Sequence, residues 1–277
     1  MSIISLENVS IIFRQRRDRM LLLDHLREVV RKMPQDGFYA LHDVGFKVER
    51  GESVGIIGAN GAGKSTLLSL LAGLVPPDKG AVRVEGRVGA LLELCSGFHP
   101  DLTGRENLLM NAALLGLDEK TARERSQSII DFSELAPFID EPLRTYSSGM
   151  YLRLGFSVAI HAEIDILLID EILTVGDLAF QKKCFDHILG LRKAAKTLVC
   201  VSHVPGVLEQ LCDRLVWLHH GQLIRDGEFD RVSADYLAFM ADPNRHFGDE
   251  IPQAPRQVVP VKEKEPHARV VPRRRRR

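Results

Sequence analysis

The stretch "GIIGANGAGKSTLL" (55–68) decides the fold. It fits the pattern G-x-x-x-x-G-K-[S/T], with Gly58, Gly63, Lys64 and Ser65 at the defined positions, between a strand-like apolar run and a helix-like one. Glycines allow the backbone to wrap around a β-phosphate with its N–H groups pointing inward. Lys64 would place a cation on the β- and γ-phosphates, and the Ser65 hydroxyl is placed to ligate Mg²⁺. The stretch therefore predicts a nucleoside triphosphate site rather than a glycine turn that binds nothing.

An acidic pair ends the apolar run "ILLIDE" (166–171), where Asp170 and Glu171 follow four buried-type residues. Taken alone, such a pair is more often a helix cap. Carboxylates at the end of a buried strand are costly unless they hold a metal or act in a site. Downstream of a phosphate loop, Asp170 is expected to hold Mg²⁺ and Glu171 to polarise the attacking water.

A histidine closes the next apolar run, "LVCVSH" (198–203). A single histidine is usually structural. His203, however, ends a predicted strand on the side of an α/β sheet where ligands bind. We therefore expect it to contact the γ-phosphate.

A possible anion site lies in "TYSSGMYLRLGF" (145–156). Ser147, Ser148 and Gly149 begin a helix-like apolar stretch, and the free N–H groups at a helix start bind anions.

Short apolar runs alternate with helical patterns along the chain, which predicts an α/β fold with a parallel sheet flanked by helices. Strands are expected at 4–13, 40–48, 53–59, 165–170 and 197–203, a helix at 64–73, and a largely helical region at 103–165 with breaks at Gly116 and Pro137.

Composition excludes several classes of protein. The chain has 277 residues, 45% hydrophobic and 27% charged, with a formal net charge of zero, as in an ordinary globular protein. Its four cysteines form no CxxC pair, so neither a disulfide framework nor a zinc site is indicated, and a reducing cytosol fits. No signal peptide is visible, and the longest apolar runs fall far short of the roughly 20 residues that a membrane span needs. Work at a membrane would require a partner.

Two segments are strongly basic. Residues 14–37 read as a basic helix, which could touch a membrane partner or lipid, or could pack on its own domain with a solvated face. Residues 241–277 hold six of the thirteen prolines, carry ten Lys or Arg against five Asp or Glu, and end in five arginines. This tail is expected to be disordered, and it could be solvated, lie near anionic lipid, or bind nucleic acid without specificity.

From about residue 4 to 240 the chain resembles the ATP-binding subunit of an ABC transporter. Gly58 to Thr66 is similar to the Walker A motif, Asp170 and Glu171 to Walker B with its catalytic glutamate, Asp177 to the D-loop and His203 to the switch histidine. Tyr146 to Met150 occupies the place of the Leu-Ser-Gly-Gly-Gln signature. The resemblance implies that Glu171 and His203 are catalytic and that Ser65 and Asp170 are the Mg²⁺ ligands. It also implies the following nucleotide contacts: Phe13, Gly58, Asn60, Gly61, Ala62, Gly63, Lys64, Ser65, Thr66, Glu93, Tyr146, Ser147, Ser148, Gly149 and Asp177.

Two departures from the family pattern point to a subgroup. The signature reads YSSGM, and Glu93 occupies the slot of the Q-loop glutamine. With "GFHPDLTGREN" (97–107) and "IDEILTVGD" (169–177), these departures resemble the subunits that export O-antigen, capsule or teichoic acid. The family's adenine-stacking aromatic would be Phe13 or, failing that, Tyr39; either could simply be core.

The resemblance also implies an architecture and partners. We expect a P-loop NTPase core over 1–240, with an N-terminal antiparallel β subdomain and an α-helical subdomain at about 98–165. Two chains would close around two ATP molecules, with Mg²⁺, and drive a polytopic ABC-2 type permease from the cytoplasmic face of a bacterial inner membrane. The lipid-linked glycan would be reached only through that permease, and no specific nucleic acid is expected. With only 37 residues after Met240, no C-terminal sugar-binding domain is expected.

Two other functions remain open at this stage. One is a soluble ABC-type ATPase acting on ribosomes or DNA, although the chain has one phosphate loop and no sustained heptads. The other is a nucleotide-dependent regulator without turnover. Glu171 and His203 argue against it, while Glu93 and Met150 leave it possible.

Overall fold

The structure is a computed structural model that describes residues 1–14, 35–91, 95–170, 176–242 and 258–261. The chain divides into two compact units. The first unit comprises Met1, Glu49–Gly55 and Gly86–Asp213, and the second comprises Ser2–Val48, Ile56–Glu85 and Arg214–Arg277.

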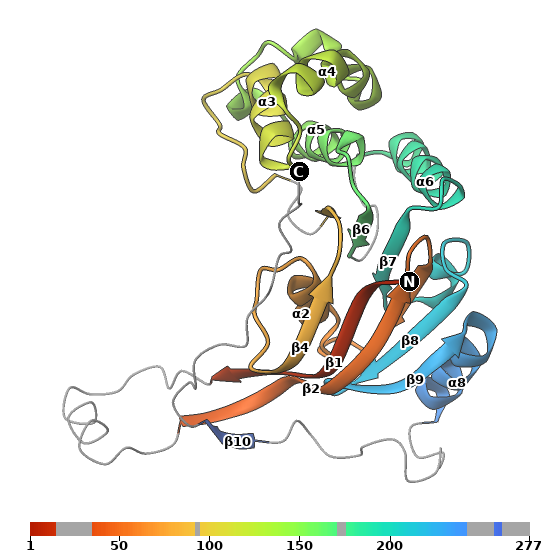
Figure 1. Cartoon of the computed structure of the whole chain (residues 1–277). Helices are drawn as coiled ribbons and strands as arrows, with labels where there is room; N and C mark the ends of the chain where they lie inside the picture. Colours follow the sequence, from red (N-terminus) through yellow and green to blue (C-terminus); the bar gives the residue numbers. More distant parts are fainter. Residues whose placement is uncertain (15–34, 92–94, 171–175, 243–257, 262–277) are drawn as a thin grey trace, which may run out of the picture. The chain divides into compact units, whose positions relative to one another are not determined.

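The second unit contains an antiparallel sheet of strand order β10-β2-β1-β4 (Figure 1). Its strands are β1 (Ser2–Arg14), β2 (Gln35–Glu49), β4 (Lys79–Val84) and β10 (Val258–Val261). Apolar side chains of β1 and β2, such as Leu6, Val9 and Val44, are buried. The β1–β4 register shifts between Glu7 and Ser10, as expected for a β-bulge.

The second unit also holds the helix after the phosphate loop and a C-terminal hairpin. These elements are α2 (Lys64–Leu71), β8 (Arg214–His219), β9 (Gln222–Glu228) and α8 (Phe229–Ala241). His220 and Gly221 join β8 to β9 with φ of 47° and 81°, the positive values that a two-residue type I′ turn requires. Helix α8 packs on the hairpin, and the buried Trp217 ring lies 5.7 Å from Tyr236 and 5.3 Å from Phe239.

The first unit is built on three parallel strands that pair in the order β5-β6-β7. Their bounds are Val88–Ala90 for β5, Ile166–Ile169 for β6 and Thr197–Ser202 for β7. Every residue of β6 and β7 is buried, which explains why both read as continuous apolar runs. Strand β3 (Ser53–Ile57) follows β7 in the strand order, and the division between the units falls within it.

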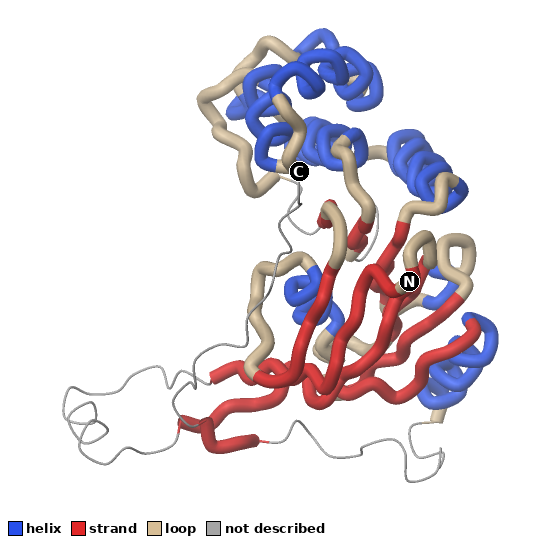
Figure 2. Tube along the Cα trace, in the orientation of Figure 1, coloured by secondary structure: helices blue, strands red, loops and turns tan. Residues whose placement is uncertain are grey.

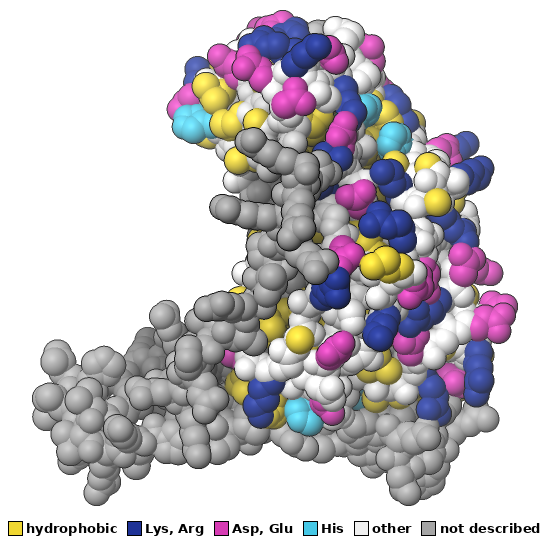
Figure 3. Space-filling model, in the orientation of Figure 1, with side chains coloured by type: hydrophobic (Ala, Val, Ile, Leu, Met, Phe, Trp, Pro, Cys, Tyr) yellow, Lys and Arg dark blue, Asp and Glu magenta, His cyan; other side chains and the backbone are white. Residues whose placement is uncertain are grey.

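The helices of the first unit are α3 (Gly104–Leu114), α4 (Glu119–Ser133), α5 (Ser148–His161), α6 (Leu178–Lys193) and α7 (Pro205–Leu208), with short 3₁₀ turns η2 (Ala136–Phe138) and η3 (Leu143–Thr145). Helices α3, α4 and α5 pack against one another (Figure 2). A capping box of Thr103 and Glu106 begins α3, and the Asp118 side chain caps α4. The face of the helical part that Figure 3 shows carries both acidic and basic side chains. Ion pairs in this part include Arg105–Asp140 and Arg123–Glu119.

The predicted fold class is confirmed, with one refinement: the larger sheet is mixed, because β8 and β9 pair antiparallel. The break at Gly116 separates α3 from α4, and Pro137 lies within η2. The basic segment 15–34 lies outside the described residues. Arg14 and 35–37, assigned to that segment from the sequence, belong to strands instead.

The prediction of a disordered tail is wrong for 258–261. These residues form β10, which pairs with β2 in the register Val258↔Phe38 to Val261↔Gln35. Proline and charge in the sequence favoured disorder, but the free edge of β2 offers N–H and C=O groups that a short strand can pair with. Residues 243–257 and 262–277 lie outside the described residues, and α8 extends to Ala241.

Candidate nucleotide site

The phosphate loop lies in the second unit, between the end of β3 and the start of α2. Gly58, Asn60, Gly61, Ala62 and Gly63 form the loop. Lys64, Ser65 and Thr66 begin helix α2.

The loop requires glycine for two different reasons. Gly63 has φ of 106°, which an L side chain rarely adopts, and a Cβ there would lie 2.6 Å from the Ala40 carbonyl oxygen. A Cβ on Gly58 would lie 2.3 Å from the carbonyl oxygen of Leu218. The neighbouring strands therefore approach this loop too closely for any larger residue.

Lys64 is the cation of the loop. Its side chain is buried, and its ammonium donates hydrogen bonds to the carbonyl oxygens of Gly58 at 2.8 Å and Ala59 at 3.1 Å. A buried ammonium needs such partners. These contacts hold the charge beside the loop backbone, where a phosphate group would be bound. The loop therefore fits a nucleotide phosphate.

Phe13 and Tyr39, the two candidate adenine-stacking residues, lie on β1 and β2 of the same unit. Phe13 is 41% exposed and its ring lies 5.9 Å from that of Phe38. The Tyr39 ring lies 4.3 Å from His42, and its hydroxyl accepts a hydrogen bond from Lys79 at 3.4 Å. Of the two rings, that of Phe13 is therefore the more accessible for stacking on an adenine.

Asp170 and His203 follow neighbouring parallel strands of the first unit. Asp170 comes directly after β6 and is half-buried, and His203 comes directly after β7 and is exposed. Because β6 and β7 are parallel neighbours, their carboxyl ends lie at the same edge of this part of the sheet. Glu171 and Glu93 lie outside the described residues.

Among the described residues, no cluster of three or more His, Cys, Asp or Glu could hold a metal ion. Ser65 has a hydroxyl oxygen and Asp170 a carboxylate, the kinds of oxygen ligand that Mg²⁺ prefers.

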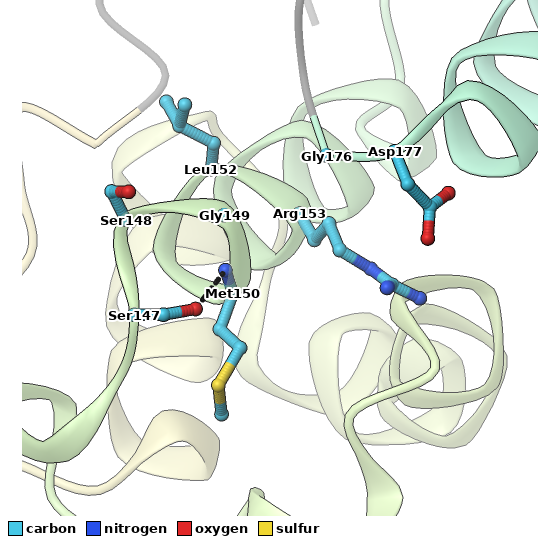
Figure 4. Close-up of a pocket in the computed structure, with 8 residues that line it drawn as sticks. All are labelled: Ser147, Ser148, Gly149, Met150, Leu152, Arg153, Gly176 and Asp177. Carbon is cyan, nitrogen blue, oxygen red and sulfur yellow. Dashed lines mark hydrogen bonds between the residues drawn. The ribbon is translucent and has the colours of Figure 1, made fainter.

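The structure brings Ser147, Ser148, Gly149 and Asp177 together around one pocket of about 470 Å³ in the first unit (Figure 4). Both helices that border the pocket present their N-terminal ends. Ser147 caps α5 by accepting a hydrogen bond from Met150 N at 3.2 Å, and Asp177 caps α6 by accepting one from Phe180 N at 2.9 Å. The N-termini of helices favour anions, and at α6 the Asp177 carboxylate is already such an anion, whereas α5 is capped by an uncharged hydroxyl.

Met150, the last residue of the signature stretch, also lines this pocket, together with three residues that the sequence analysis did not single out: Leu152, Arg153 and Gly176. Arg153 is the significant omission. Its spacing of four residues from Gly149 and three from Met150 puts it on the same face of α5, which could have indicated it.

Tyr146 was predicted to contact nucleotide. Its hydroxyl donates a 2.8 Å hydrogen bond to the carbonyl oxygen of Phe138 within the helical part of the first unit. Burial, and then the charges of Asp140 and Glu141, raise the pKa of Tyr146 to about 12. The phenol is thus neutral and supports the loop that leads into α5.

Comparison with known proteins shows the family of the chain. Residues 41–174 match the family model described as ABC transporter. The O-antigen export system ATP-binding protein RfbB of Klebsiella pneumoniae is 49% identical over 220 residues, which cover 79% of this chain and 89% of that protein. RfbB of Myxococcus xanthus is 44% identical, covering 80% of this chain and 53% of that protein. The teichoic acids export ATP-binding protein TagH of Listeria monocytogenes serotype 4b is 41% identical, covering 76% of this chain and 63% of that protein.

The fold is also similar to solved structures. A dimeric ATP-binding cassette in a post-hydrolysis state, bound to ADP and Pi, has a TM-score of 0.65 at 21% identity and covers 82% of this chain and 98% of that one. At this identity the likeness concerns the fold alone.

The fold and the phosphate loop define an ATP-binding cassette. The chain belongs to the ABC transporter family, as an ATP-binding subunit related to those of polysaccharide exporters. It is therefore a nucleotide-binding ATPase. Among the described residues, no helix combines the length and apolar character needed to cross a bilayer.

Proposed function

We propose that this chain hydrolyses ATP to power the export of a cell-surface polysaccharide of the O-antigen, capsule or teichoic-acid type through a membrane permease. The 49% identity to an O-antigen export ATP-binding protein over most of both chains carries this proposal. The permease would be of the ABC-2 type, and the chain would lie on the inner face of the bacterial plasma membrane.

In this proposal the second unit binds the nucleotide. Lys64 exchanges the carbonyl oxygens of Gly58 and Ala59 for phosphate oxygens, and the loop N–H groups bind the β-phosphate. Phe13, which is 41% exposed, stacks on the adenine, and Tyr39 is the weaker candidate because it is less exposed and its hydroxyl accepts a hydrogen bond from Lys79. The remaining loop residues, Asn60, Gly61, Ala62, Gly63 and Thr66, line the phosphates.

Hydrolysis depends on residues after β6 and β7. Ser65 and Asp170 would hold Mg²⁺, which neutralises charge on the phosphate oxygens. Glu171 would orient and polarise the attacking water, and His203 would contact the γ-phosphate. Glu93, in the glutamine slot, would lie near this metal and water.

The pocket at Ser147, Ser148, Gly149 and Asp177 would bind the triphosphate held by a second copy of the chain. The exposed N-terminus of α5, capped by the uncharged Ser147, favours an anion at this pocket, whereas the Asp177 carboxylate already occupies the N-terminus of α6. Nucleotide would thereby bind the closed dimer better than the open one, and this difference in affinity would shift the population toward closure.

The decisive variant is Glu171→Gln. It removes the carboxylate but keeps the size of the side chain, so the chain should bind ATP, lose hydrolysis and accumulate as a dimer in gel filtration. Glu119→Gln, on an exposed surface of α4, is the matched control and should hydrolyse ATP as the native chain does. Unimpaired turnover by the Glu171→Gln variant would remove the role given to Glu171.

Export itself is tested in the source bacterium. Deleting the gene should abolish the surface polysaccharide seen on gels of cell-envelope extracts, and a plasmid copy should restore it. A Lys64→Ala copy should not restore it. Restoration by that variant, or unchanged polysaccharide in the deletion strain, would contradict the proposal.

A further inference from the structure

Three charged side chains from three helices meet beside the pocket of Figure 4. Glu134 ends α4, Arg153 lies on α5, and Lys183 lies on α6. We call these three residues the helix clamp. All belong to the first unit.

Glu134 is the centre of the clamp. It is the C-cap residue of α4, with φ of 58°, a left-handed value that is uncommon for residues other than glycine. Its carboxylate forms an ion pair with Arg153 through one oxygen and with Lys183, at 3.0 Å, through the other. One carboxylate thus joins two helices to the end of a third.

Arg153 and Lys183 each make a second contact at the same helix end. Arg153 Nε donates to the Ser133 carbonyl oxygen at 3.0 Å, and Lys183 Nζ donates to the Phe132 carbonyl oxygen at 2.9 Å. The last carbonyl groups of a helix lack partners within it and carry partial negative charge. The two cations therefore satisfy the end of α4 as well as pairing with Glu134.

Aromatic rings fix the direction of both cations. The Arg153 guanidinium lies 4.6 Å from the centre of the Phe180 ring, and the Lys183 ammonium lies 4.7 Å from that of Phe132. The two rings are themselves 5.8 Å apart. Arg153 lines the pocket with only 17% of its side chain exposed, and its contacts with Ser133, Glu134 and Phe180 leave the guanidinium little freedom to reach a ligand.

The clamp continues directly into the pocket. A Cβ on Gly176 would lie 3.3 Å from Arg153 Cγ, and Phe180 N donates to the Asp177 carboxylate. Figure 4 shows the Arg153 side chain extending past Gly176 toward the side of the pocket that carries Asp177. Ser147, at the other side, caps the helix on which Arg153 lies.

We propose that the Glu134–Arg153–Lys183 clamp sets the position of the α5 N-terminus relative to the Gly176–Asp177 turn, and so shapes the pocket before nucleotide arrives. Arg153 is then a positioning residue, since its guanidinium is already used by Ser133, Glu134 and Phe180. The effect on catalysis rests on the proposed function of the pocket.

The structural part is tested on the nucleotide-free chain by amide hydrogen exchange of a Glu134→Gln variant. Exchange in 148–153 and 176–181 should become about tenfold faster, the factor expected from losing one hydrogen bond to a charged group. Glu119→Gln is the control, because its pair with Arg123 lies on the same helix but is exposed, and exposed pairs contribute little. Unchanged exchange in the Glu134→Gln variant overturns the clamp, whatever the chain's activity.

The catalytic part is tested by ATPase kinetics of Glu134→Gln and Arg153→Lys. Small displacements of a binding group lower kcat by up to about 100-fold, whereas ADP affinity of the phosphate loop in the second unit should stay the same. Arg153→Lys should recover only part of kcat, because lysine lacks the planar fork that bonds Ser133 and Glu134 at once. Either of two results overturns the positioning role of the clamp. In one, kcat, ADP affinity and the amount of folded protein fall equally; in the other, both variants keep the native kcat.

These outcomes differ from failure of the proposed function. If the native chain does not hydrolyse ATP, the proposed function fails while the exchange result still decides the clamp. If the native chain hydrolyses ATP and the clamp variants match its kcat, only the catalytic role of the clamp fails.

Discussion

The hydroxyl of Tyr146 fills the space beside Gly104, where a Cβ would lie 2.2 Å from the phenol oxygen. The same hydroxyl donates to the Phe138 carbonyl oxygen, so it cannot simply turn away. Gly104 is the first residue of α3 and Tyr146 immediately precedes the α5 cap. The pair therefore joins the starts of the two helices.

Substitution of this pair should be strongly non-additive. Gly104→Ala should lower the free energy of unfolding by about 1–3 kcal/mol through overpacking, and Tyr146→Phe by about 1 kcal/mol through loss of one hydrogen bond. In the double variant the clash with the hydroxyl is absent, so the combined loss should be smaller than the sum. Urea unfolding of all four chains measures this, and simple additivity would show that the hydroxyl does not limit the space.

Gly58→Ala tests the close approach of Leu218 to the phosphate loop. A backbone oxygen at 2.3 Å from the new Cβ has no rotamer to escape into, so the loop or β8 must move. We expect about 1–3 kcal/mol of destabilisation and loss of ATP binding, measured by unfolding and by calorimetric titration.

Gly190→Ala is the matched control for Gly58→Ala. Gly190 lies on α6, and a Cβ there meets nothing within 4 Å. Alanine should stabilise the helix by about 0.5–1 kcal/mol and leave ATP binding unchanged. If both variants behaved alike, glycine at residue 58 would not be a packing requirement.

The sequence predicted those parts of the molecule that depend on local pattern. The phosphate loop and the buried strands β6 and β7 each rest on contiguous residues, and so do the positions of Asp170 and His203 at strand ends. Ser147 as a helix start was predicted for the same reason.

Non-local pairings were not predictable in this way. Arg153 and Lys183 lie 19 and 49 residues after Glu134 in the sequence, and each of the three alone resembles a surface charge. The role of the Tyr146 hydroxyl depends on a carbonyl in another turn. Strand β10 was missed because sheet pairing is decided by a free edge elsewhere in the chain, whereas composition reports only the tendency of the segment alone.

Removing the C-terminal segment should expose the edge of β2. In a chain ending at Asp242, the amide of Gly37 or Phe38 that points toward β10 loses its partner strand and should exchange with solvent faster; the N–H groups of successive residues in a strand point to opposite sides, so only one of the two is affected. The amides of Leu6 and Glu7, which lie in the β1–β4 ladder, serve as an internal control and should not change. Equal exchange at 37–38 in both chains would show that β10 does not protect this edge in solution.

His219 should make folding stability depend on pH below neutrality. Burial, followed by the charge of the adjacent His220, lowers the pKa of His219 from 6.5 to about 4 in the folded chain. Between these values the unfolded chain binds the extra proton and the folded chain does not, so the free energy of unfolding falls as the pH is lowered from 6.5 toward 4. Burial also lowers the pKa values of His161 and His187, which act in the same direction.

The His219→Gln variant isolates the contribution of this histidine. Glutamine keeps a polar side chain beside the Phe239 ring, 5.0 Å from the histidine in the native chain, but it does not titrate. Urea unfolding at pH 7, 6 and 5 should give a shallower loss of stability in the variant than in the native chain, and most of the difference should arise below pH 6.5. If the native chain and the His219→Gln variant lose stability in parallel down to pH 5, protonation of His219 is not coupled to unfolding.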